Sequence, residues 1–382
     1  ELDAAIHRVV RSGQFILGPE VKAFEDEMAA YCGTKYAVGV ASGTDALQLA
    51  LLACGIKAGG EVITIPFTFI ATAESIAKCS ATPVFVDIDP KTYNIAPDQI
   101  EYKISKKTKA ILPVHLYGQP ADLDPILELA RKYHLKVIED CAQALGAEYK
   151  GKKVGSLGDV GCLSFFPSKV LGAYGDGGMV VTNDPKIAET VRILRVHGSK
   201  TTYQHVMHGF NSRLDALQAA ILRVKLKHLD HWNELRRSKA ALCSRLLTPL
   251  DGISTPHIAP YARHVFNYYT IRINNSVQSR STVIASPDVI GTWQSQSQSQ
   301  SKCTLNSLHQ HLNSQSIATA IYYPLSLHLQ QVYRYLGYKP GDFPESEQAQ
   351  EQVLTLPMYP ELSEEQIEDI ARAIRKFTEA GE

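Results

Sequence analysis

The stretch VGCLSFFPSKVLGAYGDGGMVV, Val160–Val181, holds one lysine, Lys169, between two short apolar runs. The runs Val160–Phe165 and Met179–Val181 are typical of buried β-strands, and a glycine-rich turn, Gly172–Gly178, precedes the second run. The link between the two runs has no helical pattern of the kind that crosses over between parallel strands. We therefore expect a mixed sheet here, with Lys169 beside a strand end, where α/β folds often carry function.

Five further runs of strand length precede this stretch and bring the expected sheet to about seven strands. They are Ala37–Val40, Val62–Ile65, Pro83–Val86, Ala110–Val114 and Lys136–Glu139. Helical patterns lie between most of them, at Asp45–Cys54, Ala71–Lys78, Pro97–Ile104 and Leu123–Tyr133. This alternation predicts an α/β fold with mostly parallel strands.

The chain divides into two expected domains. From Ser212 the apolar spacing is that of long helices, and we place the end of a large domain, residues 1–240, within them. The smaller domain, residues 241–382, has an α+β pattern. Its expected strands are Tyr268–Ile273 and Ile317–Tyr322, and its expected helices are Leu305–Asn313 and Glu364–Phe377. The Gln/Ser-rich tract within Ile290–Ser301 is too polar and repetitive to pack, which predicts a flexible surface insertion.

Composition excludes several classes of protein. At 382 residues, with 45% hydrophobic and 20% charged residues, the chain is typical of an ordinary globular protein large enough for two domains. Its 39 basic and 39 acidic residues cancel, so no net charge favours nucleic acid or an anionic membrane as partner. The seven cysteines are scattered without a C-x-x-C motif, which favours a reducing compartment. We see no membrane span or targeting pattern and expect a cytoplasmic protein.

Two other binding modes are disfavoured by spacing. His205 with His208, and His228 with His231, can each lie on one helical face, but no third ligand is suggested and we expect no metal. The run GAYGDGG does not follow the first strand and lacks the G-x-G-x-x-G spacing of dinucleotide-binding loops.

Two polar features stand at ends of the expected strands. Ser42, Gly43 and Thr44 follow the first strand and open a helix, where free N–H groups and hydroxyls can bind a phosphate. Asp140 follows the fifth strand, at the carboxyl edge where open α/β sheets bind ligands. Each feature also has a purely structural interpretation, as a helix cap or an internal ion pair.

Lys169 is the third feature. Most lysines are simply exposed to solvent. A glycine-rich turn, however, lets a bulky ligand approach the backbone, and a lysine that forms a Schiff base must be desolvated so that its amine becomes nucleophilic. A phosphate cradle, a carboxylate that can hold a pyridinium nitrogen and a lysine, in this order along the chain, together indicate pyridoxal 5'-phosphate (PLP).

Further motifs carry a family resemblance over nearly the whole chain. They include ASGTDALQLAL, FTFIATAESI, VHLYGQPADLDPI, VIEDCAQALGA, SFFPSKVLGAYGDGGMVVTND, GFNSRLDALQAAIL and IYYPLSLHLQQVY. In order and spacing they resemble the sugar aminotransferases of the DegT/DnrJ/EryC1/StrS family. The resemblance implies a fold-type-I PLP aminotransferase, working as a homodimer with active sites at the subunit interface and transferring an amino group to a nucleotide-linked keto-sugar.

Motif by motif, the resemblance also implies roles for particular residues. Lys169 matches the lysine that binds the cofactor covalently, and Asp140 matches the partner of the pyridine nitrogen. Further implied cofactor contacts are Phe69 stacked on the ring, Gln143 beside the ring hydroxyl, and Gly43, Thr44 and Ser164 at the phosphate. Asn211 is implied to reach the phosphate of the neighbouring subunit, and the implied substrate contacts are Arg213, Tyr323 and His328. Simple core packing is the alternative interpretation of Phe69, Tyr323 and His328.

The implied reaction uses glutamate as the expected donor, with Lys169 as both nucleophile and general base. The motifs resemble members acting on a 3-keto sugar, such as a dTDP-linked 6-deoxyhexose, more than members acting on a 4-keto sugar. A PLP-binding regulatory protein without turnover is a further alternative. The related dehydratases carry histidine in place of the lysine, so Lys169 argues against them. Residues 276–307 depart most from the family pattern.

Overall fold

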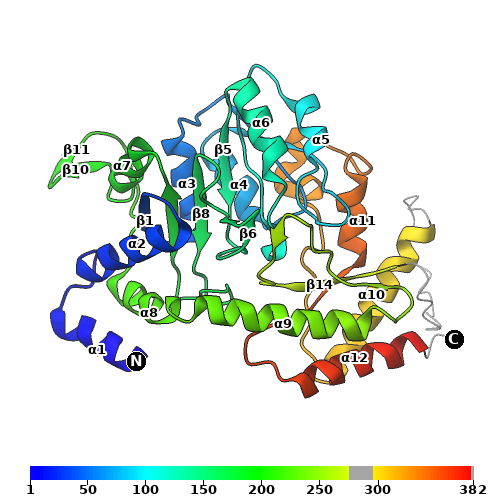
Figure 1. Ribbon diagram of the computed structural model, residues 1–382. Helices are drawn as coiled ribbons and strands as arrows, with labels where there is room; N and C mark the ends of the chain where they lie inside the picture. Colours follow the sequence, from blue (N-terminus) through cyan, green and yellow to red (C-terminus); the bar gives the residue numbers. More distant parts are fainter. Residues whose placement is uncertain (275–295, 380–382) are drawn as a thin grey trace.

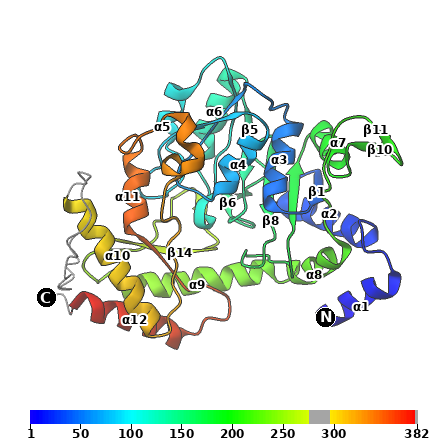
Figure 2. The ribbon, with the colours of Figure 1, turned by 180° about the vertical axis from the view of Figure 1, so that it is seen from behind.

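The computed structural model describes residues 1–274 and 296–379 of the chain. The described residues form two main apolar cores, one in an α/β part and one in a smaller α+β part, which are called the large and the smaller domain below. Both cores include residues of one long helix, α9 (Leu229–Leu247). Figure 1 shows α8 (Ala216–Leu226) and α9 following one another across the lower part of the molecule, above α1 and α12. From behind, in Figure 2, the helices of the smaller domain lie at one end and the N-terminal helix α1 (Leu2–Ser12) at the other.

A seven-stranded mixed sheet forms the centre of the large domain, in the order β1-β9-β8-β5-β4-β2-β3. Its strands are β1 (Tyr36–Val40), β2 (Glu61–Thr64), β3 (Thr82–Phe85), β4 (Thr108–Ile111), β5 (Lys136–Asp140), β8 (Val160–Ser164) and β9 (Gly178–Thr182). Only β9 runs antiparallel to its neighbours, β1 and β8. The predicted mixed, mostly parallel sheet is confirmed, and the orientation reverses across the turn that follows Lys169.

Helices connect the strands and cover the sheet. Besides α1, α8 and α9 they are α2 (Pro19–Cys32), α3 (Gly43–Ala53), α4 (Ile70–Lys78), α5 (Pro97–Ile100), α6 (Leu123–Tyr133) and α7 (Pro185–Leu194). α3 packs on β8 and β9 and contacts both α4 and α7, while α2 packs against β1 and α8. Cover on both faces explains why the strands read as continuous apolar runs, with every residue of β9 buried.

The smaller domain contains a three-stranded antiparallel sheet in the order β12-β14-β15. These strands are β12 (Ile253–Ser254), β14 (Tyr269–Ile273) and β15 (Val353–Leu356), and the helices beside them are α10 (Gln296–Ser314), α11 (Pro344–Gln352) and α12 (Glu364–Glu379). A separate apolar core joins this sheet to the second half of α9, beginning at Ala240. The domain boundary placed near residue 240 therefore falls inside α9, and it stays a prediction.

Two shorter sheets complete the described fold. One contains β6 (Glu148–Tyr149), β7 (Lys152–Lys153) and β13 (Ala262–Arg263), and the other is the hairpin of β10 (Ser199–Thr201) and β11 (Gln204–His205). The hairpin projects from the body of the large domain in both ribbon views (Figures 1 and 2). No helix in the described ranges is both long enough and apolar enough to cross a membrane.

Two sequence expectations for the smaller domain differ from the structure. Ile317–Tyr322 was expected to form a strand, but only Ala320 pairs, in an isolated bridge with Thr355. The chain leaves the sheet there because the carbonyl of Tyr322 accepts a hydrogen bond from the hydroxyl of Tyr117 in the large domain. In the Gln/Ser-rich tract, residues 290–295 lie outside the described residues, whereas the backbone is helical from Gln296, earlier than expected.

Candidate active site

A cavity of about 330 Å³ lies at the carboxyl edge of the central sheet, which is a volume suited to a small ligand or cofactor. Most of the predicted site residues line it: Gly43, Thr44, Phe69, Asp140, Gln143, Ser164, Lys169 and Tyr323. They come from strand ends and helix starts that are far apart in the sequence. The motifs gave only their order along the chain, and the fold brings them together in one cavity.

The N-terminus of α3 opens into the cavity, and its close approach to β8 requires a glycine. A Cβ added at Gly43 would lie 2.6 Å from Cβ of Ser164, closer than side chains pack. Ser42 caps the helix by accepting a hydrogen bond from the N–H of Asp45 at 3.1 Å. The structural interpretation of Ser42 is thus correct, and it leaves the first N–H groups of α3 beside the hydroxyl-bearing Thr44 and Ser164, as an anion site requires.

Lys169 lies on a tightly packed turn between β8 and β9. Its N–H donates to the carbonyl of Phe166 at 2.9 Å. A Cβ at Gly172 would lie 2.2 Å from the carbonyl oxygen of Pro167, so the turn tolerates no side chain there. The same turn is held from α8, where Lys225 donates to the carbonyl of Gly172. The backbone beneath Lys169 is therefore fixed from two sides.

The amine of Lys169 is partly removed from water. Burial lowers its pKa, and the negative charge of Asp140 partly opposes this shift. Its Nζ lies 5.8 Å from the centre of the Tyr268 ring. A lysine held in this way is neutral at a lower pH than a solvated lysine, which favours nucleophilic and proton-transfer chemistry.

Asp140 ends β5 and is 5% exposed. Its Oδ2 accepts a hydrogen bond from the hydroxyl of Thr72 at 2.9 Å, and its Oδ1 accepts one from the N–H of Ala142 at 3.1 Å. Burial raises the pKa of this carboxyl, whereas the two hydrogen bonds and the charge of Lys169 act in the opposite direction. A buried carboxylate facing a cavity calls for a cationic partner in the ligand.

Gln143, Tyr323 and Phe69 form the polar and aromatic walls. The side-chain oxygen of Gln143 accepts from the N–H of Tyr117 at 2.7 Å, and its Nε2 donates to the hydroxyl of Tyr323 at 2.9 Å. Phe69, at the start of α4, is 56% exposed even though it lines the cavity. An exposed aromatic face beside a carboxylate and a lysine offers a stacking surface for a planar ring.

Three predicted site residues do not line the cavity. His328 is 2% exposed, its Nε2 is 3.0 Å from a carboxylate oxygen of Glu347, and its ring packs on Phe343. This contact with Glu347 on α11 holds the ring among residues that do not line the cavity, and the role of His328 near a sugar stays a prediction. Asn211 and Arg213 follow the β10–β11 hairpin, where the backbone of Asn211 bridges to Val196. Their roles at a neighbouring subunit stay predictions.

Sequence reasoning missed several residues that the cavity includes. Thr72 lies in the first turn of α4, so its place after Phe69 in FTFIAT was a usable signal for a residue near Asp140. Tyr268 and Tyr322 reach the cavity from the smaller domain, through contacts that no local pattern encodes. Ser168 and Asp176, on either side of the Lys169 turn, were likewise not assigned roles.

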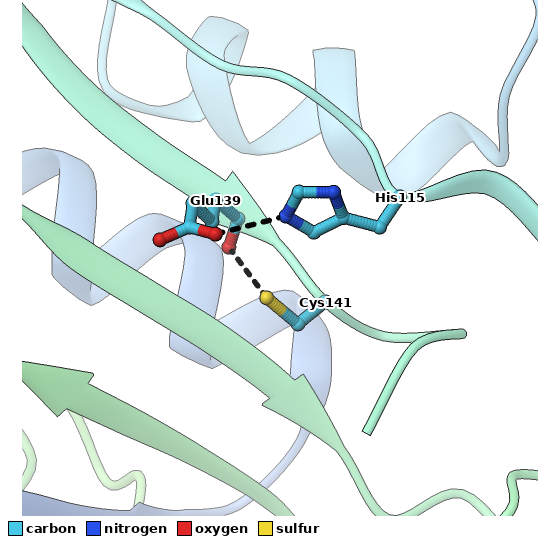
Figure 3. Close-up of side chains that lie close together, drawn as sticks. All are labelled: His115, Glu139 and Cys141. Atoms are coloured by element: carbon cyan, nitrogen blue, oxygen red, sulfur yellow. Dashed lines mark hydrogen bonds and ion pairs between the residues drawn. The ribbon is translucent and has the colours of Figure 1, made fainter. Parts of the chain in front are cut away.

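Within the part of the chain that the structure describes, one group of side chains has donor atoms close enough to hold a metal: His115, Glu139 and Cys141 (Figure 3). Its members already have partners within the protein. Nε2 of His115 is 3.0 Å from Glu139, and the thiol of Cys141 donates to the carbonyl of Glu139 at 3.7 Å. Burial raises the pKa of this thiol, which disfavours the thiolate that a metal binds. The group is a hydrogen-bonded cluster behind Asp140 rather than an open metal site.

Comparison with known proteins agrees with this geometry. The model of the DegT/DnrJ/EryC1/StrS aminotransferase family matches residues 1–292 and 288–375, and the chain belongs to this family. It is 48% identical over 379 residues to a pleiotropic regulatory protein of Geobacillus stearothermophilus, covering 99% of this chain and 94% of the relative. It is 45% identical over 376 residues to the UDP-N-acetyl-3-dehydro-alpha-D-glucosamine 3-aminotransferase of Acidithiobacillus ferrooxidans, covering 98% and 93%.

A solved structure shows the same fold. The S. venezuelae protein DesV, in complex with a ketimine intermediate, matches with a TM-score of 0.89 at 42% identity, covering 99% of this chain and 94% of that chain. The predicted family and enzyme class are confirmed: the chain is a PLP-dependent nucleotide-sugar aminotransferase.

The residues of the cavity fit this cofactor, because a helix N-terminus kept open by Gly43, a buried carboxylate and a desolvated lysine surround one space.

Replacing Gly43 with alanine tests the cradle. The added Cβ would meet Ser164 at 2.6 Å, so α3 has to shift away from β8. Such overpacking costs about 1–3 kcal/mol, and we expect PLP to bind about 10- to 100-fold more weakly, measured by equilibrium dialysis. Gly60→Ala is the matched control, since it lies outside the cavity and its Cβ would be 3.2 Å from Lys57. Unchanged PLP affinity in Gly43→Ala would contradict this account of the cradle.

Proposed function

We propose that this enzyme transfers an amino group from glutamate to the 3-keto group of a nucleotide-linked sugar, such as a dTDP-linked 6-deoxyhexose. The observation that carries the proposal is the meeting of Lys169, Asp140 and the N-terminus of α3 in one cavity. The choice of the 3-keto position is supported by the Acidithiobacillus relative, whose name places its reaction at carbon 3. The alternative is a 4-keto nucleotide sugar, whereas a regulatory protein without turnover, which the sequence left open, does not agree with the enzyme class established above.

We assign Lys169 and Asp140 the central roles. When bound, PLP supplies an electron sink that stabilises negative charge on the donor's α-carbon. Asp140 holds a proton at the pyridine nitrogen, because a carboxylate kept in a desolvated cavity is best satisfied by a cationic N–H. Lys169, with its lowered pKa, takes the proton from the α-carbon and returns it to the cofactor.

The remaining cavity residues bind and orient. Gly43, Thr44 and Ser164 hold the phosphate at the N-terminus of α3, where N–H groups point outward. The exposed ring of Phe69 stacks on the pyridine ring, and Gln143 lies beside its hydroxyl. Tyr323 contacts the sugar from the smaller domain, because its hydroxyl already faces the cavity next to Gln143.

We further propose that two copies of the chain complete each site. Among the described residues that line the cavity, Lys169 is the one cation, whereas the donor carries carboxylates and the sugar nucleotide carries phosphates. The β10–β11 hairpin projects from the body with Tyr203, Val206 and Met207 exposed by 91%, 58% and 42%. We place this hairpin against the partner subunit, so that Asn211 and Arg213 reach the partner's cavity.

Lys169→Ala separates binding from chemistry. We expect the variant to bind PLP without covalent attachment and to lose turnover of glutamate and keto-sugar by at least about 100-fold, since it lacks the proton-transfer group. Amino-sugar formation measured by mass spectrometry gives the rate, and Lys22→Ala, at an exposed lysine paired with Asp26, is the control. Turnover close to that of the control would rule out the proposed role.

A panel of nucleotide-linked 3-keto and 4-keto sugars tests the substrate. With glutamate as donor, we expect kcat/KM to be highest for the 3-keto compounds. A higher kcat/KM for the 4-keto compounds would contradict the proposed carbon. Failure to aminate any compound of the panel would contradict the proposed substrate class.

Mixing two inactive variants tests the shared site. If Asn211 acts across the interface, a heterodimer of Lys169→Ala and Asn211→Ala subunits contains one intact site. We therefore expect activity to appear after subunit exchange, measured against each variant alone. No recovery in mixtures that native mass spectrometry shows to contain heterodimers would mean that Asn211 does not act in the partner's site.

A further inference from the structure

Glu139 is a fully buried carboxylate directly before Asp140 on β5. Adjacent strand residues point to opposite faces, so Glu139 faces away from the cavity. Its Oε1 accepts from the N–H groups of Leu157 and Gly158 at 2.9 and 2.7 Å, and its Oε2 accepts from the N–H of Gly155 at 2.7 Å. A buried charge is tolerated only with such a full set of partners.

His115 supplies the remaining partner of Glu139. Its Nδ1 accepts from the N–H of Ala121 at 3.0 Å, which places the ring proton on Nε2, facing Glu139 at 3.0 Å (Figure 3). Burial raises the pKa of Glu139, but the bonds from His115, Gly155 and Gly158 outweigh it and lower the pKa overall. Glu139 therefore stays ionised, and the Nε2–H of His115 is one of its four donors.

The same histidine is tied to the backbone of Asp140. The N–H of His115 donates to the carbonyl of Asp140 at 3.0 Å, and the N–H of Asp140 donates to the carbonyl of Pro113 at 2.9 Å. The chain after β4 is thus paired with Asp140 at two points. The side-chain contact between Glu139 and His115 links the same two segments a third time, one residue before Asp140.

The turn that begins at His115 also orients Gln143. Tyr117, two residues on, donates its N–H to the side-chain oxygen of Gln143. This bond leaves Nε2 of Gln143 facing the hydroxyl of Tyr323. One buried contact therefore stabilises the segments that hold both polar groups expected at the cofactor ring, Asp140 and Gln143.

We propose that Glu139 and His115 are positioning residues for the cofactor ring: their buried contact holds Asp140 at the pyridine nitrogen and Gln143 beside the ring hydroxyl. The inference rests on the proposed role of Asp140. Neither residue touches the cavity, so both act through the backbone that they fasten.

Three variants test the pair in the holoenzyme. Glu139→Gln keeps the shape, but in either orientation its NH₂ group faces backbone N–H donors that the carboxylate accepted. His115→Gln keeps a donor toward Glu139, whereas His115→Phe removes it. Asp159→Asn is the matched control, since Asp159 fastens the opposite end of the same strand through Lys136 and the N–H of Val137, at 2.6 and 2.9 Å.

The decisive readout is the ¹⁵N NMR shift of the ring nitrogen in enzyme loaded with [¹⁵N]PLP, which reports protonation at that atom. We expect Glu139→Gln and His115→Phe to move the shift toward the unprotonated value and to lower kcat by up to about 100-fold through misplacement. His115→Gln should be milder, and Asp159→Asn should keep the wild-type shift.

A wild-type shift in Glu139→Gln and His115→Phe, with only a lower unfolding midpoint, would overturn the positioning role and leave the proposed function intact. If Glu139→Gln does not fold, the two His115 variants decide. Equal ¹⁵N shifts in His115→Gln and His115→Phe would overturn the proposal, and a smaller change in His115→Gln than in His115→Phe would support it. Asp140→Asn tests the role of Asp140 separately from the positioning role of Glu139 and His115. A protonated ring nitrogen in that variant would overturn the role of Asp140 itself.

Discussion

The structure depends on two opposite charges that share one poorly solvated cavity, the carboxylate of Asp140 and the amine of Lys169. Burial pushes both toward their neutral forms, and their mutual attraction partly opposes it. Neither group has another side chain of opposite charge among its hydrogen-bond partners in the described residues. A cofactor with a cationic ring nitrogen and an aldehyde satisfies both, which is why the fold and the chemistry of PLP agree here.

Three backbone segments around the cavity are held in place, and they keep Asp140 and Lys169 in position. The turn of Lys169 is pinned by α8, the approach of α3 to β8 depends on Gly43, and the end of β5 is paired with the chain after β4. The parallel arrangement around β5 makes this possible, because it delivers several strand ends to the same edge. The antiparallel β9 then closes the site by returning the chain through the turn that carries Lys169.

Much of this could be predicted from the sequence, because local pattern determined it. Strands buried on both faces read as apolar runs, and the helix Leu123–Tyr133 has the bounds expected from its spacing. The failures share one cause, which is long-range contact. Ile317–Tyr322 forms one bridge, at Ala320, instead of the expected strand, and the carbonyl of Tyr322 accepts a hydrogen bond from Tyr117. Nothing near Tyr268 or Tyr322 in sequence marks their place at the cavity.

The most direct test of the account is to find where the cofactor is attached. Reduction of the purified holoenzyme with borohydride, followed by digestion and mass mapping, fixes the cofactor on whichever amine holds it. The structure predicts one phosphopyridoxyl group on the peptide that carries Lys169. Label on a different lysine, or none on any peptide of an enzyme that contains PLP, would contradict the shared cavity of Lys169 and Asp140 as the site of chemistry.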